Sequence, residues 1–206
     1  MKNSLKNFNS GKFALVLILI TIFLVQCNWP LVEYYKVSYF QLEQNYSIDD
    51  SINNVLEYDS LFFKCNLFVD YNNDYVTNGE CPCYEITYYI LDYYKSIEAI
   101  TIYDYNEDYL AGDTISDILT FYYFDEINPH YNYNKKIITF EAYGEPMIYK
   151  NINHFLYVQA PHYAYPFQLQ LNVPPDSIQI FQFKLNIELM DGRKFTLYSL
   201  PIKIQP

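Results

Sequence analysis

The four cysteines offer the most versatile chemistry in this sequence, because a thiol can carry a lipid, pair with a second thiol or bind a metal ion. Cys27 directly follows an apolar run, apart from the other three. Of those three, Cys65 can pair with Cys81 or with Cys83. Cys81 and Cys83 suit each other poorly, because strand residues two apart point the same way and Pro82 stiffens the link. Zinc prefers four ligands at spacings that Cys-Pro-Cys without a nearby histidine does not supply, so the sequence favours one disulfide over a metal site.

Two acidic segments have the spacing of the first three ligands of an EF-hand calcium loop: Asp70-x-Asn72-x-Asp74 and Asp104-x-Asn106-x-Asp108. In both, a tyrosine replaces the required glycine, and a residue without a carboxylate replaces the bidentate glutamate. Tyr75 and Tyr109 stand in place of the glycine in the first and second segment, and Cys81 and Ile115 stand in place of the glutamate. We therefore predict solvated turns and no dedicated metal site, with unspecialised calcium binding as the alternative.

The remaining titratable residues form no familiar catalytic arrangement. His130, His154 and His162 show neither H-x-x-x-H nor H-E-x-x-H spacing, and their Pro- or Tyr-rich surroundings are typical of loops. The sequence contains no G-x-S-x-G turn, no G-x-x-x-x-G-K-[ST] phosphate loop and no G-x-G-x-x-G turn. Its 24 acidic residues produce paired carboxylates by chance. We therefore predict a protein that is not an enzyme, with no catalytic residue and no cofactor.

The first residues have the proportions of a secretory signal peptide. Three lysines, Lys2, Lys6 and Lys12, precede an apolar run from Phe13 to Val25. A helix of that length spans about 20 Å, well short of the roughly 30 Å hydrocarbon core of a bilayer. The pattern therefore predicts a cleaved leader and not a membrane-spanning helix.

The end of this run, Leu24-Val25-Gln26-Cys27, resembles the lipobox of bacterial lipoproteins, although Gln26 stands where a small residue is usual. The resemblance implies cleavage before Cys27, a diacylglycerol on its thiol and an acyl chain on its new amino group. Each buried CH₂ contributes about 0.8 kcal/mol, so two or three chains hold a protein stably at a membrane. We predict a lipoprotein signal peptide over residues 1–26 and lipid attachment at Cys27. Plain secretion and an uncleaved signal anchor are the alternatives.

The mature chain from Cys27 has a size and charge that narrow its class. Its 180 residues suit one domain over 27–206, and its 10 basic and 24 acidic residues give a net charge of −14. Such a chain, with Arg193 as its one arginine, lacks the basic contacts that bind phosphate backbones. Nucleic acid is thereby excluded as a partner.

Aromatic residues are unusually frequent, with 25 tyrosines and 15 phenylalanines. Tyrosine is spread through almost every segment, which favours packing as half-buried strand residues with hydroxyls that reach water. The alternative is a surface that binds glycans or peptides by stacking.

Short aromatic and β-branched runs, separated by Asn, Asp, Pro and Gly, predict seven to nine strands. The clearest is Phe181–Leu189, whose alternate residues are apolar, followed by a two-residue turn at Asp191-Gly192 and a partner strand over Lys194–Ile204. One short helix is predicted after the capping residues Asp113 or Thr114, through Leu119. Further strands are predicted at Glu33–Leu42, Leu61–Asp70, Tyr84–Leu91, Ile97–Tyr103, Lys136–Ala142, Phe155–Val158 and Phe167–Val173. Together they predict an all-β, antiparallel, immunoglobulin-like β-sandwich behind an N-terminal signal helix.

The segment Lys95–Leu119, with Asp191-Gly192-Arg193-Lys194-Phe195, is similar to uncharacterised outer-membrane lipoproteins of Bacteroidota, grouped as a domain of unknown function. The similarity implies a cell-envelope lipoprotein and supplies no catalytic residues. The stretch after the cysteine, Asn28–Val32, is neutral and leaves the membrane face open.

The leading hypothesis is a lipid-anchored envelope protein that serves as a non-enzymatic accessory or recognition module. Two alternatives stand beside it. One is a glycan-binding or glycan-active secreted protein that uses surface tyrosines, for which two convergent carboxylates in a cleft would argue. The other is a structural envelope component, which a large exposed apolar patch would indicate.

Overall fold

The aromatic and β-branched runs fold as β-strands in the computed structural model, which describes residues 31–46, 54–70, 86–132, 137–142, 144–158 and 162–206. The chain forms two compact units, one of Met1–Glu33 with Asn73–Tyr89 and one of Tyr34–Asn72 with Ile90–Pro206. In the first unit, the described residues belong to β1 (Leu31–Tyr35) and β5 (Ile86–Ile90), which pair with each other. The predicted signal peptide and its boundary at Cys27 lie outside the described residues.

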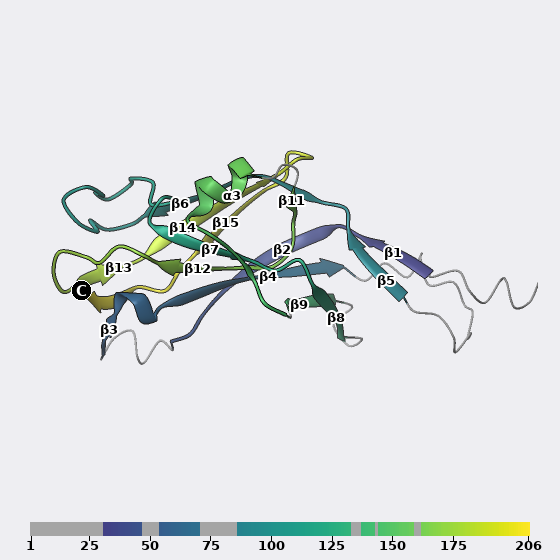
Figure 1. Ribbon diagram of the computed structural model, residues 1–206, viewed down its shortest axis with the longest axis horizontal. Coiled ribbons are helices and arrows are strands. Elements are labelled where there is room, and N and C mark those ends of the chain that lie inside the picture. Colours follow the sequence, from purple (N-terminus) through teal and green to yellow (C-terminus); the bar gives the residue numbers. More distant parts are fainter. Residues whose placement is uncertain (1–30, 47–53, 71–85, 133–136, 143, 159–161) are drawn as a thin grey trace, which may run out of the picture. The chain divides into compact units, whose positions relative to one another are not determined.

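The second unit holds three sheets (Figure 1). A seven-stranded sheet contains β2 (Val37–Gln44), β4 (Phe62–Asp70), β7 (Leu119–Tyr123), β8 (Ile127–Asn132), β9 (Ile137–Ala142), β10 (Met147–Tyr149) and β12 (Phe167–Leu171). A four-stranded sheet has the order β11 (His162–Tyr163), β6 (Tyr93–Thr101), β14 (Phe183–Leu189), β15 (Lys194–Tyr198). A three-stranded sheet contains β13 (Gln179–Phe181), β16 (Ile202–Gln205) and β3 (Val55–Glu57). The described helices are η1 (Tyr58–Ser60) and α3 (Ile152–Val158).

The seven-stranded and four-stranded sheets pack their apolar faces together. In β14 every second residue, from Phe183 through Leu189, is buried, while the residues between them keep partial exposure. Phe183 meets Phe63 of β4 edge to face, with ring centroids 4.8 Å apart, and Tyr94 of β6 meets Phe167 of β12 at 5.8 Å. The predicted class, an all-β antiparallel sandwich with one short helix, is confirmed. A parallel pairing joins β16 to β3.

The hairpin of β14 and β15 is confirmed, but its turn is longer than predicted. The Gly192 N–H donates to the Leu189 carbonyl at 2.9 Å, and the Leu189 N–H donates to the Arg193 carbonyl at 2.9 Å. Gly192 takes a φ of +90°, which only glycine adopts without strain. This is a type I turn closed by a glycine bulge, not a two-residue turn. The returning strand also breaks before Pro201, so that β15 and β16 join different sheets.

The one α-helix of the described residues lies where a strand was predicted. Phe155–Val158 has high strand propensity, yet it forms the last part of α3, because Asn151 caps the helix by accepting the His154 N–H at 2.8 Å. Ile152 and Phe155, three residues apart, share the buried face of α3. Tertiary burial of these two side chains outweighs local propensity.

The helix predicted after Asp113 or Thr114 does not form. Ile115 donates its N–H to the Ala99 carbonyl at 2.8 Å, and Thr114 forms an isolated bridge to Ile100 of β6. The Asp113 carboxylate accepts the N–H of Leu110, three residues earlier, at 2.9 Å. The segment therefore pairs with a strand edge, which satisfies the amides that a helix would have used.

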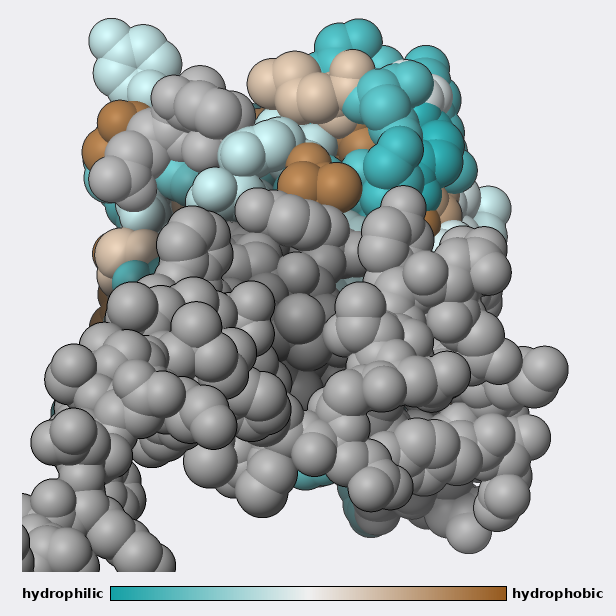
Figure 2. Space-filling view, turned by 90° about the vertical axis from the view of Figure 1, so that its right-hand side faces the viewer, coloured by the Kyte–Doolittle hydropathy of each residue, from teal (hydrophilic) through white to brown (hydrophobic). Residues whose placement is uncertain are grey.

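Exposed apolar side chains are scattered over several elements instead of forming one element's face. On the face drawn in Figure 2, the described residues mix hydrophilic and hydrophobic side chains. Isolated apolar residues of this kind are normal on a protein surface.

A polar clamp joins the hairpin turn to β2. The Asp92 carboxylate, only 6% exposed, accepts the Val37 N–H at 2.6 Å and pairs with the Arg193 guanidinium at 2.5 Å. The guanidinium also donates to the Val37 carbonyl and, at 2.7 Å, to the exposed Asp191 carboxylate. The buried Asp92 carboxylate thus accepts hydrogen bonds from both Val37 and Arg193, and the clamp ties the two packed sheets at one end.

We expect Asp92→Ala to lower the free energy of unfolding by about 2–4 kcal/mol, because it leaves the buried Val37 amide without its acceptor and removes one of the acceptors of the partly buried guanidinium. Asp191→Ala, which removes the exposed partner of the same arginine, is the matched control and should cost much less, because solvent screens an exposed ion pair. Urea unfolding measures both. Equal losses in the free energy of unfolding would show that the buried carboxylate of Asp92 stabilises the fold no more than the exposed carboxylate of Asp191.

Candidate functional site

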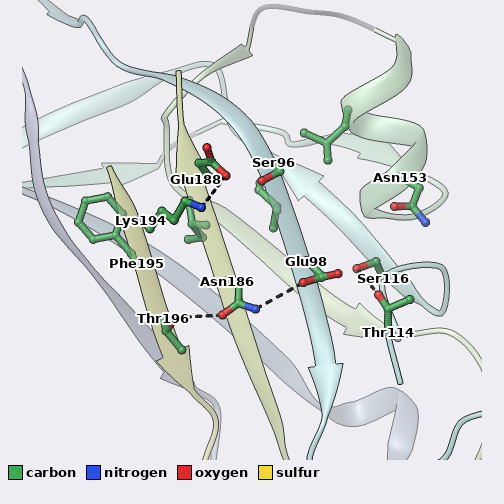
Figure 3. Close-up of a pocket in the computed structure, with 13 residues that line it drawn as sticks. Ser96, Glu98, Thr114, Ser116, Asn153, Asn186, Glu188, Lys194, Phe195 and Thr196 are labelled. Carbon is green, nitrogen blue, oxygen red and sulfur yellow. Dashed lines mark hydrogen bonds and ion pairs between the residues drawn. The ribbon is translucent and has the colours of Figure 1, made fainter. Parts of the chain in front are cut away.

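A hollow of about 550 Å³, lined by both polar and apolar residues, lies on the outer face of the four-stranded sheet. Its floor is formed by side chains of three neighbouring strands, namely Ser96 and Glu98 of β6, Asn186 and Glu188 of β14, and Lys194 and Thr196 of β15. Its wall is formed by Thr114 and Ser116 and by Asn153 and Leu156 of α3 (Figure 3). We call this site the outer hollow.

Strand register places the floor residues in two cross-strand rows. In the first row, Asn186 lies opposite Glu98 on one side and Thr196 on the other. In the second, Glu188 lies opposite Ser96 and Lys194. Because strand side chains alternate between faces, the burial of Leu185 and Ile187 forces Asn186 and Glu188 outward.

The first row is a chain of hydrogen bonds. The Thr196 hydroxyl donates to the Asn186 side-chain carbonyl at 3.0 Å, and the Asn186 amide donates to the Glu98 carboxylate at 3.4 Å. This chain fixes the orientation of the Asn186 amide, so the outer hollow presents amide, hydroxyl and carboxylate groups in set directions.

The second row is an ion cluster. A β-bulge inserts Lys95 beside Ser96, so that Lys95 reaches Glu188 at 2.6 Å while Lys194 approaches it at 3.5 Å. The hydrogen bond from Lys95, with a further contribution from Lys194, lowers the pKa of Glu188. Glu188 therefore stays ionised at neutral pH, and its charge is offset by two lysines.

The wall of the outer hollow is fixed to β6. The Ser116 hydroxyl oxygen accepts the Ala99 N–H at 2.9 Å, and the Thr114 hydroxyl lies 3.2 Å from the Ala99 carbonyl. Phe155 packs α3 against the sandwich. Its ring stacks on Phe121 and on His162, with ring centroids 4.1 and 3.8 Å apart. The His162 Nε2–H donates to the Phe155 carbonyl at 2.8 Å.

The predicted site residues are only partly within the described structure. Cys65 is a fully buried free thiol on β4, and burial raises its pKa, so it is inert toward solvent. Cys27, Cys81 and Cys83 lie outside the described residues. The pairing of Cys65 with Cys81 or Cys83 therefore stays a prediction, and it requires a partner sulfur to reach the sandwich core.

The acidic loop at Asp104–Asp108 uses its side chains to bind its own backbone. The side-chain carbonyl of Asn106 accepts the N–H groups of Asp108 and Tyr109, each at 3.0 Å. The Asp104 carboxylate accepts the Ala111 N–H at 2.8 Å. Within the described part of the chain, no group of three or more His, Cys, Asp or Glu side chains is arranged to hold a metal ion. The first acidic segment, except Asp70 at the end of β4, lies outside that part.

All three histidines lie in regular structure instead of the predicted loops. His130 is on β8, His154 on α3 and His162 on β11. His162 is buried among the rings of Phe155, Tyr123 and Tyr149. This burial lowers its pKa despite the opposing hydrogen bond to Phe155.

The outer hollow contains two carboxylates, those of Glu98 and Glu188. Glu98 and Glu188 are diagonal neighbours, which places such residues about 7–8 Å apart across an antiparallel pair. Glycoside hydrolysis requires one carboxyl of such a pair to be protonated. The two lysines disfavour the protonated form of Glu188, so Glu188 does not supply the proton of such a pair.

Comparison with known proteins yields little. No family model matches the sequence, and a search of curated proteins finds no match. Among solved structures, the C-terminal domain of the Streptococcus pyogenes antigen I/II-family protein AspA aligns at 9% sequence identity with a TM-score of 0.27. The alignment covers 82% of this chain and 46% of that one, so the chain spans less than half its length. A similarity at this level says nothing about function.

We expect stability to fall as the pH drops from about 7 to 5.5, because His162 binds a proton more readily in the unfolded chain, where its pKa is about 6.5, than in the folded one. The loss of stability begins near the pKa that His162 has in the unfolded chain, and it grows as the pH falls toward the lowered pKa of His162 in the folded protein. His162→Phe keeps a ring in place and removes the titration, so its melting temperature should vary less over this range. His154→Gln, an exposed histidine on α3, is the control and should retain the wild-type slope. An unchanged slope in His162→Phe would contradict the assignment.

Proposed function

We propose that this protein is a lipid-anchored recognition module of a bacterial outer membrane, that it is not an enzyme, and that it binds its ligand in the outer hollow. The observation that carries the proposal is the convergence of polar side chains from three strands, a loop and α3 on one concave site. A solvated sheet face needs no such wall, whereas ligand sites are concave and present a few oriented polar groups.

The chemistry of the outer hollow favours recognition over catalysis. Its carboxylate Glu188 is held ionised between Lys95 and Lys194, and Asn186 is oriented by Thr196. Hydroxyl, amide and carboxylate groups with fixed directions serve hydrogen bonding to a polar ligand. The floor lies on regular strands, which hold such groups more rigidly than loops do.

The envelope location is supported by the sequence. The lysine-rich start, the short apolar run and Cys27 have the arrangement of a lipoprotein leader, and Lys95–Leu119 is similar to outer-membrane lipoproteins. Among the residues that the structure describes, no helix has the length and apolar character needed to span a bilayer. Attachment through fatty chains on Cys27 is the anchoring that we propose.

We expect Cys27→Ala to move the protein from the membrane fraction to the soluble fraction of the expressing cell, because the acyl chains supply the membrane affinity. Cell fractionation followed by mass spectrometry of the N-terminus measures both location and acyl mass. Cys65→Ala is the matched control and should remain in the membrane fraction. A wild-type product that retains Met1 and a bare Cys27 thiol would refute the anchor.

We expect the full chain, purified in detergent, to bind envelope material of its own cell through the outer hollow. Thr196→Trp should reduce this binding at least tenfold, because the bulky ring fills the site from an exposed position on β15. Lys203→Trp places the same ring at an exposed position on β16, outside the outer hollow, and should bind like wild type. Surface plasmon resonance measures the binding. Equal binding by both variants would refute the recognition role of the outer hollow.

A further inference from the structure

We infer that the outer hollow binds a neutral carbohydrate, with an exposed tyrosine beside the hollow stacking on a sugar ring. This inference rests on the proposed recognition role and adds the chemical class of the ligand. Three properties of the outer hollow lead to it: its mixture of donors and acceptors, its charge and the tyrosines beside it.

The polar groups of the outer hollow match hydroxyl groups, which donate and accept at the same atom. Asn186 and Asn153 each carry an amide that does both, Ser96 and Thr114 carry hydroxyls, and Glu98 is an acceptor. A carboxylate that accepts from one amide at a long 3.4 Å retains lone pairs for further donors. A ligand rich in hydroxyls fits this mixture better than one with acceptors alone.

The charge of the outer hollow disfavours acidic ligands. The lysines near it, Lys95 and Lys194, both pair with Glu188, at 2.6 and 3.5 Å. Glu98 adds a second negative charge, and the whole chain carries a net charge of −11. The two lysines and two carboxylates balance, so the outer hollow offers no excess positive charge to phosphate groups, sialic acids or uronic acids, and the acidic chain as a whole repels them, whereas a neutral sugar is unaffected.

Tyrosines lie beside the outer hollow on two elements. On β15, Tyr198 follows Thr196 on the same outward face and is 60% exposed. It forms the next cross-strand row, directly opposite Lys184 of β14. On α3, Tyr157 is 89% exposed and follows Asn153 by four residues, so both lie on one face of the helix.

These exposed rings differ from most of the described aromatic residues, which are buried or partly buried. An exposed tyrosine offers a flat apolar face to the C–H groups of a sugar and a hydroxyl to water. The volume of about 550 Å³ lies within the range of about 300–1,000 Å³ that small-molecule sites occupy. A flat platform next to a polar hollow is the combination that a sugar requires, because one face of its ring is apolar and its edge is polar.

The test is a glycan array with neutral, sialylated and uronate-containing oligosaccharides, probed with the full chain in detergent. We expect binding to neutral glycans and little to acidic ones. For a neutral array glycan that binds, calorimetry should show a loss of about fivefold or more in affinity for Tyr198→Ala and for Glu98→Gln. Tyr103→Ala, which removes another exposed tyrosine two residues past the end of β6 and outside the lining of the outer hollow, is the matched control and should bind like wild type. A silent array, a preference for acidic glycans, or binding that survives Thr196→Trp would overturn the inference.

A second arm separates failure of this inference from failure of the recognition role. Envelope material is treated either with periodate, which cleaves vicinal diols in sugars, or with protease, before it is offered to the wild-type chain and to Thr196→Trp. Binding that depends on the outer hollow, is lost after periodate and survives protease supports a carbohydrate. Binding that depends on the outer hollow, survives periodate and is lost after protease overturns the carbohydrate while leaving the recognition role intact. Binding that is unchanged in Thr196→Trp overturns both the carbohydrate inference and the recognition role of the outer hollow.

Discussion

The alternation of side chains along β14 is the constraint on which the outer hollow depends. Phe183, Leu185 and Ile187 are buried against the opposite sheet, and their burial fixes which residues of β14 face outward. A slip of one residue would bury Glu188 and expose the core side chains, so the register is specified by the apolar face. The same register sets Asn186 between Glu98 and Thr196, and Glu188 between Ser96 and Lys194. The polar floor is thus a consequence of the packing on the other side of the sheet.

The hairpin that carries this floor is itself tied to the rest of the sandwich by Arg193. Its guanidinium lies at the start of β15 and reaches Asp92 and the backbone of Val37. Asp92 in turn accepts the Val37 N–H. A buried carboxylate needs such donors, and here they come from Val37 and Arg193, which are far in sequence from Asp92 and from each other. The position of β15 against β2 therefore follows from one small polar network as well as from the contact of Phe40 with Phe195.

The abundance of tyrosine has a mainly structural explanation, with a local exception. Tyr94, Tyr105 and Tyr123 are buried, and each hydroxyl donates to a backbone carbonyl. Burial also raises their pKa values, so these hydroxyls remain protonated donors. Tyrosine in this fold is a large apolar residue that brings its own hydrogen bond into the sandwich. The rings of Tyr157 and Tyr198 are exposed instead of buried, so they are available to stack on a ligand.

The sequence by itself determined the strand class, the wet and dry faces of Phe183–Leu189 and the place of the hairpin, because alternation and a glycine turn are local signals. It also indicated the outward positions of Asn186 and Glu188. It could not show that Thr114, Ser116 and Asn153 would complete a wall, because those residues reach the outer hollow through contacts distant in sequence. Tertiary structure alone decided that Phe155 lies on a helix, that Ile115 pairs with β6 and that Lys95 enters a bulge. In each case a non-local contact, a buried ring or a strand edge outweighed a local preference that was too weak to decide by itself.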